Sequence, residues 1–181
     1  MNYRKELTLK NGKTLLLRNC IEADVRESQE VFEKTHGETD FLLTYPDENS
    51  FNLEGQVEYI KNKADSNNEV EIAAFVDGKM AGTAGVDAVG SKFKLQHRAE
   101  FGIGILKEYW GLGIGSQLTL ACIECAKKAG YEELDLDVVA DNDRALAMYK
   151  KLGFTEYGRN PKGFKSRLCG YQELVYMRLE L

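Results

Sequence analysis

The segment Trp110-Gly-Leu-Gly-Ile-Gly115 carries glycines at three alternate positions, after an apolar run at residues 101–106 and before a stretch with helical periodicity. Without Cβ atoms, the backbone here can approach a ligand closely. Amides at the start of the next helix, with the positive end of its dipole, favour an anion. The junction predicts a phosphate-binding turn, although such glycine clusters are also typical of tight turns that bind nothing.

The residues after the glycines alternate between helix and strand patterns. Four apolar residues recur at helical spacing and form one stripe: Leu118, Cys122, Cys125 and Ala129. Gly130 is typical of a helix stop. Residues 134–139 alternate as a strand, and a helix at 144–152 follows an N-capping run at 141–143 and ends at Gly153. The order strand, glycine turn, helix, strand, helix predicts an α/β domain.

The same order occurs in half of a dinucleotide-binding domain, which also places a diphosphate on a glycine turn. An acid about twenty residues further on would then bind the ribose, and Glu132, Glu133 and Asp137 are candidates. That fingerprint needs glycines at positions one, three and six, whereas Ser116 holds the sixth position. A dinucleotide-dependent oxidoreductase is therefore the runner-up.

Two motifs together resemble the GNAT superfamily of acetyl-CoA-dependent N-acetyltransferases, from about Thr14 to the end of the chain. The first is the glycine run at residues 110–115, which is similar to the family's acetyl-CoA loop. The second is the ordered set Asn142, Ala145, Tyr149 and Leu152-Gly153-Phe154. Trp110 replaces the usual Gln or Arg, as in members that resemble ribosomal-protein acetyltransferases, and this places diphosphate binding on backbone amides.

The resemblance implies an α/β (α+β) GNAT fold over residues 1–181, a single domain. Its central sheet would be mixed and largely antiparallel, with about seven strands and helices on both faces. It also implies an N-acetyltransferase that transfers an acetyl group from acetyl-CoA to a primary amine of a small molecule or peptide by direct attack. A domain that binds acyl-CoA without turning it over is a further alternative.

The resemblance implies these cofactor-binding residues: Ile103, Gly104, Ile105, Gly111, Leu112, Gly113, Ile114, Gly115, Ser116, Asn142 and Tyr149. Tyr149 would donate a proton to the departing thiolate, and Glu100 would accept one from the amine. Each has a structural alternative. Glu100 could be a solvated or salt-bridged strand glutamate, for example one paired with Arg98. Tyr149 could be core packing, and Asn142 could be only an N-cap neighbour.

Composition narrows the classes of function. The chain has 181 residues, 43% of them hydrophobic and 29% charged, which suits one soluble domain. A net charge of −5 argues against nucleic-acid binding, and no apolar run is long enough for a membrane span or signal peptide, so we expect cytoplasmic residence. Cys122 and Cys125 lie on the apolar helix stripe, which favours a place in the core over a metal or redox site. We expect no metal site from the cysteines or from His36 and His97.

Turn signals organise the remainder of the chain. Asn11-Gly12 and Asp77-Gly78 predict hairpins between strands at residues 7–9 and 14–17 and at 70–76 and 79–88. Helical segments are expected at 22–35 and 53–64. Strands are expected at 154–158 and 171–181 around a basic loop. A homodimer through the terminal strands is compatible with the sequence. Acids in the first helix connection suit a cationic acceptor, whereas the basic loop suits an anionic one. Ordinary surface charge explains either feature without any substrate.

Overall fold

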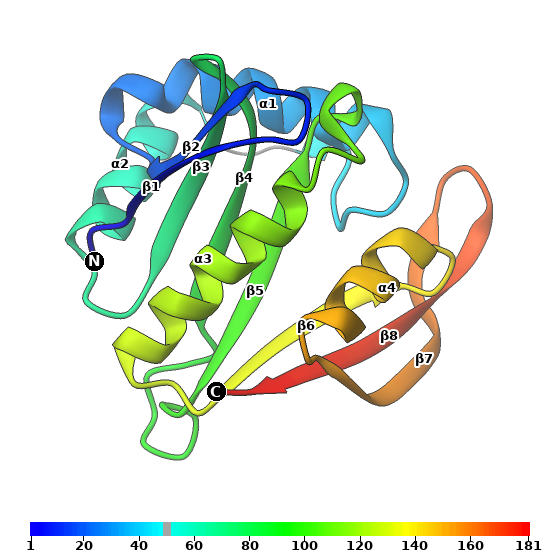
Figure 1. The fold of residues 1–181 in the computed structure, drawn as a ribbon. Helices are drawn as coiled ribbons and strands as arrows, with labels where there is room; N and C mark the ends of the chain where they lie inside the picture. The colour runs from blue at the N-terminus through cyan, green and yellow to red at the C-terminus, as the bar shows by residue number, and fades with distance from the viewer. Residues whose placement is uncertain (49–51) are drawn as a thin grey trace.

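A computed structural model describes residues 1–48 and 52–181, and within them eight strands form one sheet (Figure 1). The strands are β1 (Arg4–Thr8), β2 (Thr14–Asn19), β3 (Val70–Val76), β4 (Lys79–Ala88), β5 (Arg98–Ile105), β6 (Glu133–Val139), β7 (Thr155–Ser166) and β8 (Gly170–Glu180). Their order is β1-β2-β3-β4-β5-β6-β8-β7, and β5 with β6 is the one parallel pair in the described part of the sheet. The sheet has one strand more than the resemblance implied. A mainly antiparallel sheet also rules out the doubly wound dinucleotide-binding alternative.

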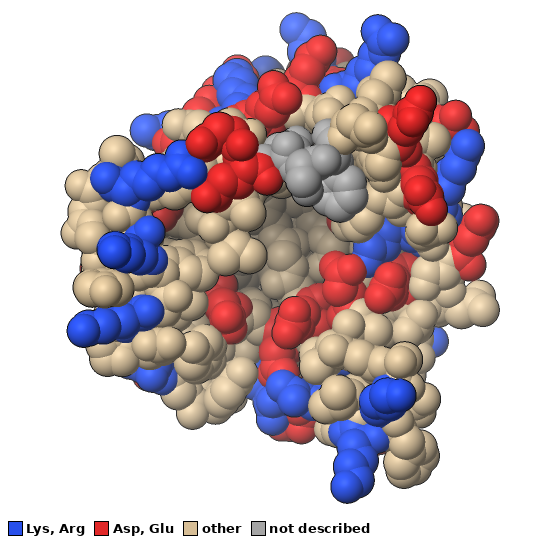
Figure 2. Space-filling view, turned by 180° about the vertical axis from the view of Figure 1, so that it is seen from behind, with Lys and Arg blue, Asp and Glu red and all other residues tan. Residues whose placement is uncertain are grey.

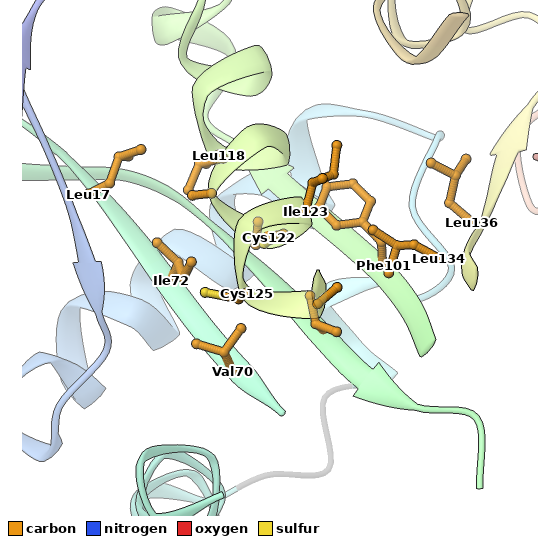
Figure 3. Packing of buried hydrophobic residues seen from close by; sticks show 14 of the residues in the cluster. Leu17, Val70, Ile72, Phe101, Leu118, Cys122, Ile123, Cys125, Leu134 and Leu136 are labelled. Carbon is orange, nitrogen blue, oxygen red and sulfur yellow. The ribbon is translucent and has the colours of Figure 1, made fainter. Parts of the chain in front are cut away.

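Helices cover both faces of the sheet, as expected. They are α1 (Val25–Glu38), α2 (Leu53–Asp65), α3 (Ile114–Ala129) and α4 (Asp143–Lys151). Because side chains alternate along a strand, Val70 and Ile72 of β3 pack with α3, whereas Ala73 and Phe75 pack with α1 and α2. Figure 3 shows Leu118, Cys122 and Cys125 of α3 directed at the residues of β2 and β3. Helix α4 lies on the α3 side, where Tyr149 joins the same core cluster.

Strands β5 and β6 part soon after they begin, which opens a gap in the middle of the sheet (Figure 1). They pair only over Arg98–Glu100 and Glu133–Asp135. Asp135, only 4% exposed, holds this closed end: it accepts from Arg98 Nη2 at 2.5 Å and from Arg178 Nε at 2.7 Å. The ion cluster ties β5, β6 and β8 together where the gap starts.

The basic loop expected after residue 158 is wrong, because β7 continues through it to Ser166. The pairing with β8 shifts register between Glu156 and Gly158 and again between Asn160 and Phe164. Pro161 falls within the second shift, on a strand at the edge of the sheet. An edge strand tolerates a residue without an N–H, because that residue need not pair with a further strand. Pro161, a residue typical of turns, can therefore lie inside β7.

Within the described ranges, no helix combines the length and the apolar character needed to cross a bilayer.

Candidate active site

The glycine turn opens toward the start of α3. Gly111 and Gly113 have φ angles of +82° and +85°, which disfavour residues with a Cβ atom. A Cβ atom at either position would meet nothing within 4 Å, so the space beside the turn is open. No described residue accepts a hydrogen bond from the backbone amides of residues 111–116. The turn therefore presents unpaired N–H groups at a helix start, where an anion binds well.

The third glycine has a different role. A Cβ atom on Gly115 would lie 3.1 Å from Met148 Sδ of α4 and 3.4 Å from Ile105 Cδ1 of β5. Gly115 lies inside α3 and has no positive φ angle. Glycine at this position lets α3 approach α4 and the end of β5 closely. Of the three alternate glycines, Gly111 and Gly113 therefore allow the positive φ angles of the turn, whereas Gly115 allows close packing of α3.

Trp110 is tied back to the strand that precedes the turn. Its indole Nε1 donates to the Ile105 carbonyl at 2.8 Å. The Arg144 guanidinium lies 5.1 Å from the centre of the Trp110 ring, a distance typical of a cation–π contact. Trp110 therefore fixes the turn against β5 and α4, and the amides do not share the opening with a polar side chain at position 110.

Residues 103–105 lie on β5 beyond Glu100, the last residue of that strand that pairs with β6. In the described structure no strand covers this edge of β5 inside the gap. Gly104 faces α1, where a Cβ atom would lie 3.5 Å from Thr35 Oγ1. The edge can pair with an extended ligand as a neighbouring strand would.

Tyr149 of α4 lies against the gap on the α3 side. Its ring packs 6.1 Å from the ring of Phe101 on β5 and 5.6 Å from that of Phe154. The residue is 6% exposed, and burial raises the pKa of the phenol. Its oxygen has no hydrogen-bond partner among the described residues, and part of the surface of this oxygen is open to solvent. The ring is core packing, while the hydroxyl keeps its proton and remains accessible.

Asn142 is the N-cap of α4, and its Oδ1 accepts from the amide of Ala145 at 3.2 Å. Its side-chain nitrogen has no partner within the described residues and remains a donor. The capping alternative is therefore correct for the oxygen and leaves the nitrogen available to a ligand.

Glu100 lies on the other face of the sheet. It is exposed and stands opposite Asp87 of β4. Arg98 binds Asp135 and Glu133 instead, so the Glu100–Arg98 ion pair does not form, and a solvated strand glutamate stays the structural alternative. On β6, Asp137 is also exposed, and partial burial and the nearby Asp135 raise its pKa. Neither carboxylate has a partner among the described residues.

These carboxylates belong to a face with a visible hollow. Figure 2 shows the side of the molecule opposite α3, where acidic side chains lie on both sides of a central depression. The cationic groups nearest in the sheet, Arg98 and Arg178, are already paired with Asp135 and Glu133. This face therefore carries unbalanced negative charge and attracts cations.

A group of contacts that we call the clasp joins the segment after α1 to the β7–β8 hairpin. Its members are Asp40, Tyr45, Ser166, Arg167 and Gln172. Asp40 accepts from Ser166 Oγ at 2.5 Å and from Tyr45 OH at 2.8 Å. The Asp40 carbonyl accepts from Gln172 Nε2 at 3.0 Å, and the Arg167 amide donates to Tyr45 OH at 2.9 Å. Hydrogen bonds from Ser166 and Tyr45 lower the pKa of Asp40 despite some desolvation.

The clasp also resolves the charge question left by the sequence. Arg167 of the basic segment pairs with Asp47 at 2.7 Å and with Glu48 at 3.1 Å, both in the first helix connection. Glu38 accepts from the amide of Lys107 at 2.7 Å. Arg167, Asp47 and Glu48, which seemed to select opposite kinds of acceptor, therefore pair with one another.

His36, Cys122 and Cys125 have structural surroundings. Nδ1 of His36 lies 2.7 Å from the Phe32 carbonyl, and burial lowers the pKa of the ring. Cys122 and Cys125 are 0% and 2% exposed in the core, as expected. The described ranges hold no group of three or more His, Cys, Asp or Glu suited to a metal ion.

Comparison with known proteins places this geometry in a family. The model of the Acetyltransferase (GNAT) family matches residues 34–154. The chain is 31% identical over 108 residues to L-amino acid N-acetyltransferase AaaT of Escherichia coli, covering 59% of this chain and 65% of the relative. It is 32% identical over 74 residues to N-alpha-acetyltransferase 30 of Schizosaccharomyces pombe, covering 41% of this chain and 49% of that protein. These matches span about half to two thirds of each relative.

Solved structures agree over almost the whole chain. A GNAT-family acetyltransferase from Streptococcus pneumoniae superposes with a TM-score of 0.88 at 28% identity, covering 92% of this chain and 99% of that one. The structure of yncA from Salmonella typhimurium with its cofactor acetyl-CoA has the same fold, with a TM-score of 0.82 at 16% identity and 92% and 94% coverage. The protein belongs to the Acetyltransferase (GNAT) family.

Proposed function

We propose that the protein is an N-acetyltransferase that moves an acetyl group from acetyl-CoA to a primary amine by direct attack. One observation supports this most: an unpaired amide turn, an uncovered strand edge and a protonated tyrosine meet along one gap in the sheet. A nucleotide thioester such as acetyl-CoA needs a binding site for its diphosphate, a partner for its extended arm and a proton for its departing thiolate.

The residues present fit acetyl-CoA. The amides of residues 111–116 suit its diphosphate, since the turn is open and no described group competes for them. The edge of β5 at residues 103–105 suits the pantetheine arm, with the Ile105 carbonyl already shared with Trp110. The free side-chain nitrogen of Asn142 is a further donor on the same side.

When bound, acetyl-CoA supplies an activated acetyl group whose thiolate must leave with a proton. Tyr149 is the proposed donor, because burial keeps its phenol protonated while its oxygen stays accessible. Glu100 is the proposed acceptor of the amine's proton, directly or through water. A lysine-like amine is neutral in only about one molecule in 2,000 at pH 7, against roughly one in seven for an α-amine. Alkylamine acceptors therefore need this base most.

The acceptor is a small-molecule or peptide amine that reaches the gap from the hollow face. The unpaired carboxylates Glu100 and Asp137 attract such an amine in its cationic form. Named relatives act on amino acids or on α-amino groups. Amino acids and peptide N-termini are accordingly the first acceptors to test, followed by polyamines.

Cytoplasmic residence and a homodimer remain predictions. Strands β1 and β7 are the edges of the sheet and are available for pairing with a second copy. Sedimentation at micromolar concentration distinguishes the monomer from the dimer.

The function is tested by thiol release from acetyl-CoA in the presence of the amine panel. Release that depends on an amine supports it, whereas binding of acetyl-CoA without release supports a non-catalytic acyl-CoA-binding domain. A matched pair of variants tests the site. Gly113→Ala and Gly78→Ala both place a Cβ at φ +85° with nothing within 4 Å, so their backbone strain is similar. Only Gly113→Ala should raise the KM for acetyl-CoA; equal effects would contradict the assignment of the turn.

A further inference from the structure

The glycine turn faces a second segment of the chain across a small cavity. The cavity has a volume of about 310 Å³ and is lined by Lys10, Asn11, Gly111, Leu112 and Gly113. The first two residues belong to the turn between β1 and β2, which lies beside the start of α3 in Figure 1. Lys10 and the glycine turn with its unpaired amides therefore line the same space.

The β1–β2 turn is ordered by its own hydrogen bonds. The amide of Leu9 donates to the Lys13 carbonyl at 2.8 Å, and the amide of Gly12 donates to the Leu9 carbonyl at 2.9 Å. The Asn11 side chain accepts from the amide of Lys13 at 3.2 Å. Lys10 thus extends from a fixed backbone, which limits the positions that its ammonium group can reach.

Lys10 has no ion pair or hydrogen bond with any described residue. Its neighbour Lys13 differs, because its ammonium lies 3.9 Å from Asp77. Two other cations near the glycine turn, Lys107 and Arg144, lie over the ring of Trp110 at 6.0 and 5.1 Å. Lys10 is the cation that lines the cavity itself.

We propose that Lys10 binds a phosphate group of acetyl-CoA and completes an anion site whose other wall is the glycine turn. The inference rests on the proposed function for the identity of the ligand. A helix start and its amides supply only partial charges, whereas a diphosphate carries full negative charge. With Trp110 in place of a polar residue, the turn has no side-chain cation at that position, and Lys10 supplies it from a distant part of the sequence.

The expected effect is moderate, because an exposed ammonium is screened by salt and water. Lys10→Gln should weaken coenzyme A binding about three- to tenfold at about 50 mM salt, and the loss should shrink at about 500 mM. Lys10→Arg should retain most of the affinity. Lys13→Gln, which removes the same charge from the same turn, should leave affinity unchanged.

Calorimetry with coenzyme A and with 3′-dephospho-coenzyme A tests the proposal without requiring turnover. If Lys10→Gln weakens binding of both ligands, Lys10 binds the diphosphate. If it weakens only coenzyme A, Lys10 binds the 3′-phosphate. Unchanged affinity and salt dependence for both ligands overturn the proposal, as does an equal loss in Lys13→Gln.

The same titrations separate this proposal from the proposed function. Wild-type protein that binds coenzyme A through Lys10 but releases no thiol with any amine would retain the phosphate site and reject the transferase. If the wild type releases thiol and Lys10→Gln binds coenzyme A normally, the transferase is supported and the role of Lys10 is overturned. Absence of coenzyme A binding by the wild type would overturn both.

Discussion

The two sides of the gap between β5 and β6 are built in different ways. On the α3 side, most groups that face the gap are backbone atoms of one continuous segment, residues 103–116. On the side of α1 and α2, the groups beside the gap are side chains from separate strands, Glu100 of β5 and Asp137 of β6. A backbone surface changes little when side chains are exchanged, whereas the opposite surface depends on each residue. The proposed cofactor side is therefore constrained by conformation, and the proposed acceptor side can vary residue by residue.

The two sides also differ in charge. Unpaired amides and Lys10 make the α3 side attractive to an anion. Glu100 and Asp137 make the other side attractive to a cation. An anionic thioester and a cationic amine would thus approach the gap from opposite faces, and neither has to pass the other. Substitutions of binding groups on one side should change the KM of one substrate only.

The largest effect should come from Tyr149→Phe, on the cofactor side. The ring packing against Phe101 and Phe154 stays, so the fold and coenzyme A affinity should be retained. Loss of the proton donor should lower kcat by about a hundredfold or more. Thiol-release kinetics and calorimetry measure the two quantities, with Tyr157→Phe on the exposed part of β7 as control. An unchanged kcat would leave Tyr149 with a packing role alone.

Asp135→Asn should have the next largest effect, on stability, because Asp135 joins the two sides at the closed end of the gap. Removing a buried charge between Arg98 and Arg178 should cost about 3 kcal/mol of unfolding free energy. Denaturant unfolding measures it, with the exposed Asp141→Asn as control. A loss no larger than that of the control would show that the strands are held together by other contacts.

The pH dependence gives this prediction a second test. Burial raises the pKa of Asp135, but hydrogen bonds from Arg178 and Arg98 outweigh burial and hold it below the usual value. The carboxylate therefore stabilises the fold above the pKa it has in the unfolded chain, and this contribution is lost as pH falls through the lowered folded value. The difference in unfolding free energy between wild type and Asp135→Asn should therefore become smaller as the pH falls through the folded pKa of Asp135.

Local patterns predicted the elements of the fold well. The segments at residues 70–76 and 79–88 are confirmed as strands, because Asp77-Gly78 forces a tight turn between two apolar runs. The helical stripe through Leu118 and Cys122 is confirmed as core. Strand β7 was not predicted beyond residue 158, since turn-forming composition at Pro161 does not reveal that the strand lies at an edge.

The site was predictable only where it is local in sequence. Gly111 and Gly113 form one turn, and their spacing is visible in the sequence. Asp40 and Ser166 are 126 positions apart, and neither carries a motif. Asp135 stands in an alternating strand pattern that gives no sign of its two arginine partners. Contacts that depend on tertiary packing leave no short-range signal, so the acceptor side had to come from the structure. The roles of Glu100, Tyr149 and the cofactor-binding residues stay predictions.

A smaller effect is expected from Glu100→Gln, on the acceptor side. If Glu100 accepts the amine's proton, the variant should lose about tenfold in kcat/KM for an alkylamine, most strongly below neutral pH, where the amine is most protonated. The KM for acetyl-CoA should not change. Asp137→Asn removes the other unpaired carboxylate of the same face. It should raise the KM for the amine without altering the pH profile. Identical pH profiles for both variants would mean that Glu100 only attracts the cationic amine and does not accept its proton.

The smallest effect should come from opening the clasp with Ser166→Ala. The variant removes the hydroxyl that donates to Asp40 and accepts from Tyr45 OH and from the amides of residues 168 and 169. The hydrogen bonds of Tyr45 and Gln172 to Asp40 remain. The segment after α1 should then lie less firmly against the β7–β8 hairpin, and the KM for the amine should rise about threefold, equivalent to well under one hydrogen bond to a charged group. Acetyl-CoA affinity and kcat should match those of the exposed control Ser91→Ala. A rise in the KM for acetyl-CoA instead would mean that the clasp couples the two sides, and that the division between a conformational and a side-chain surface does not hold.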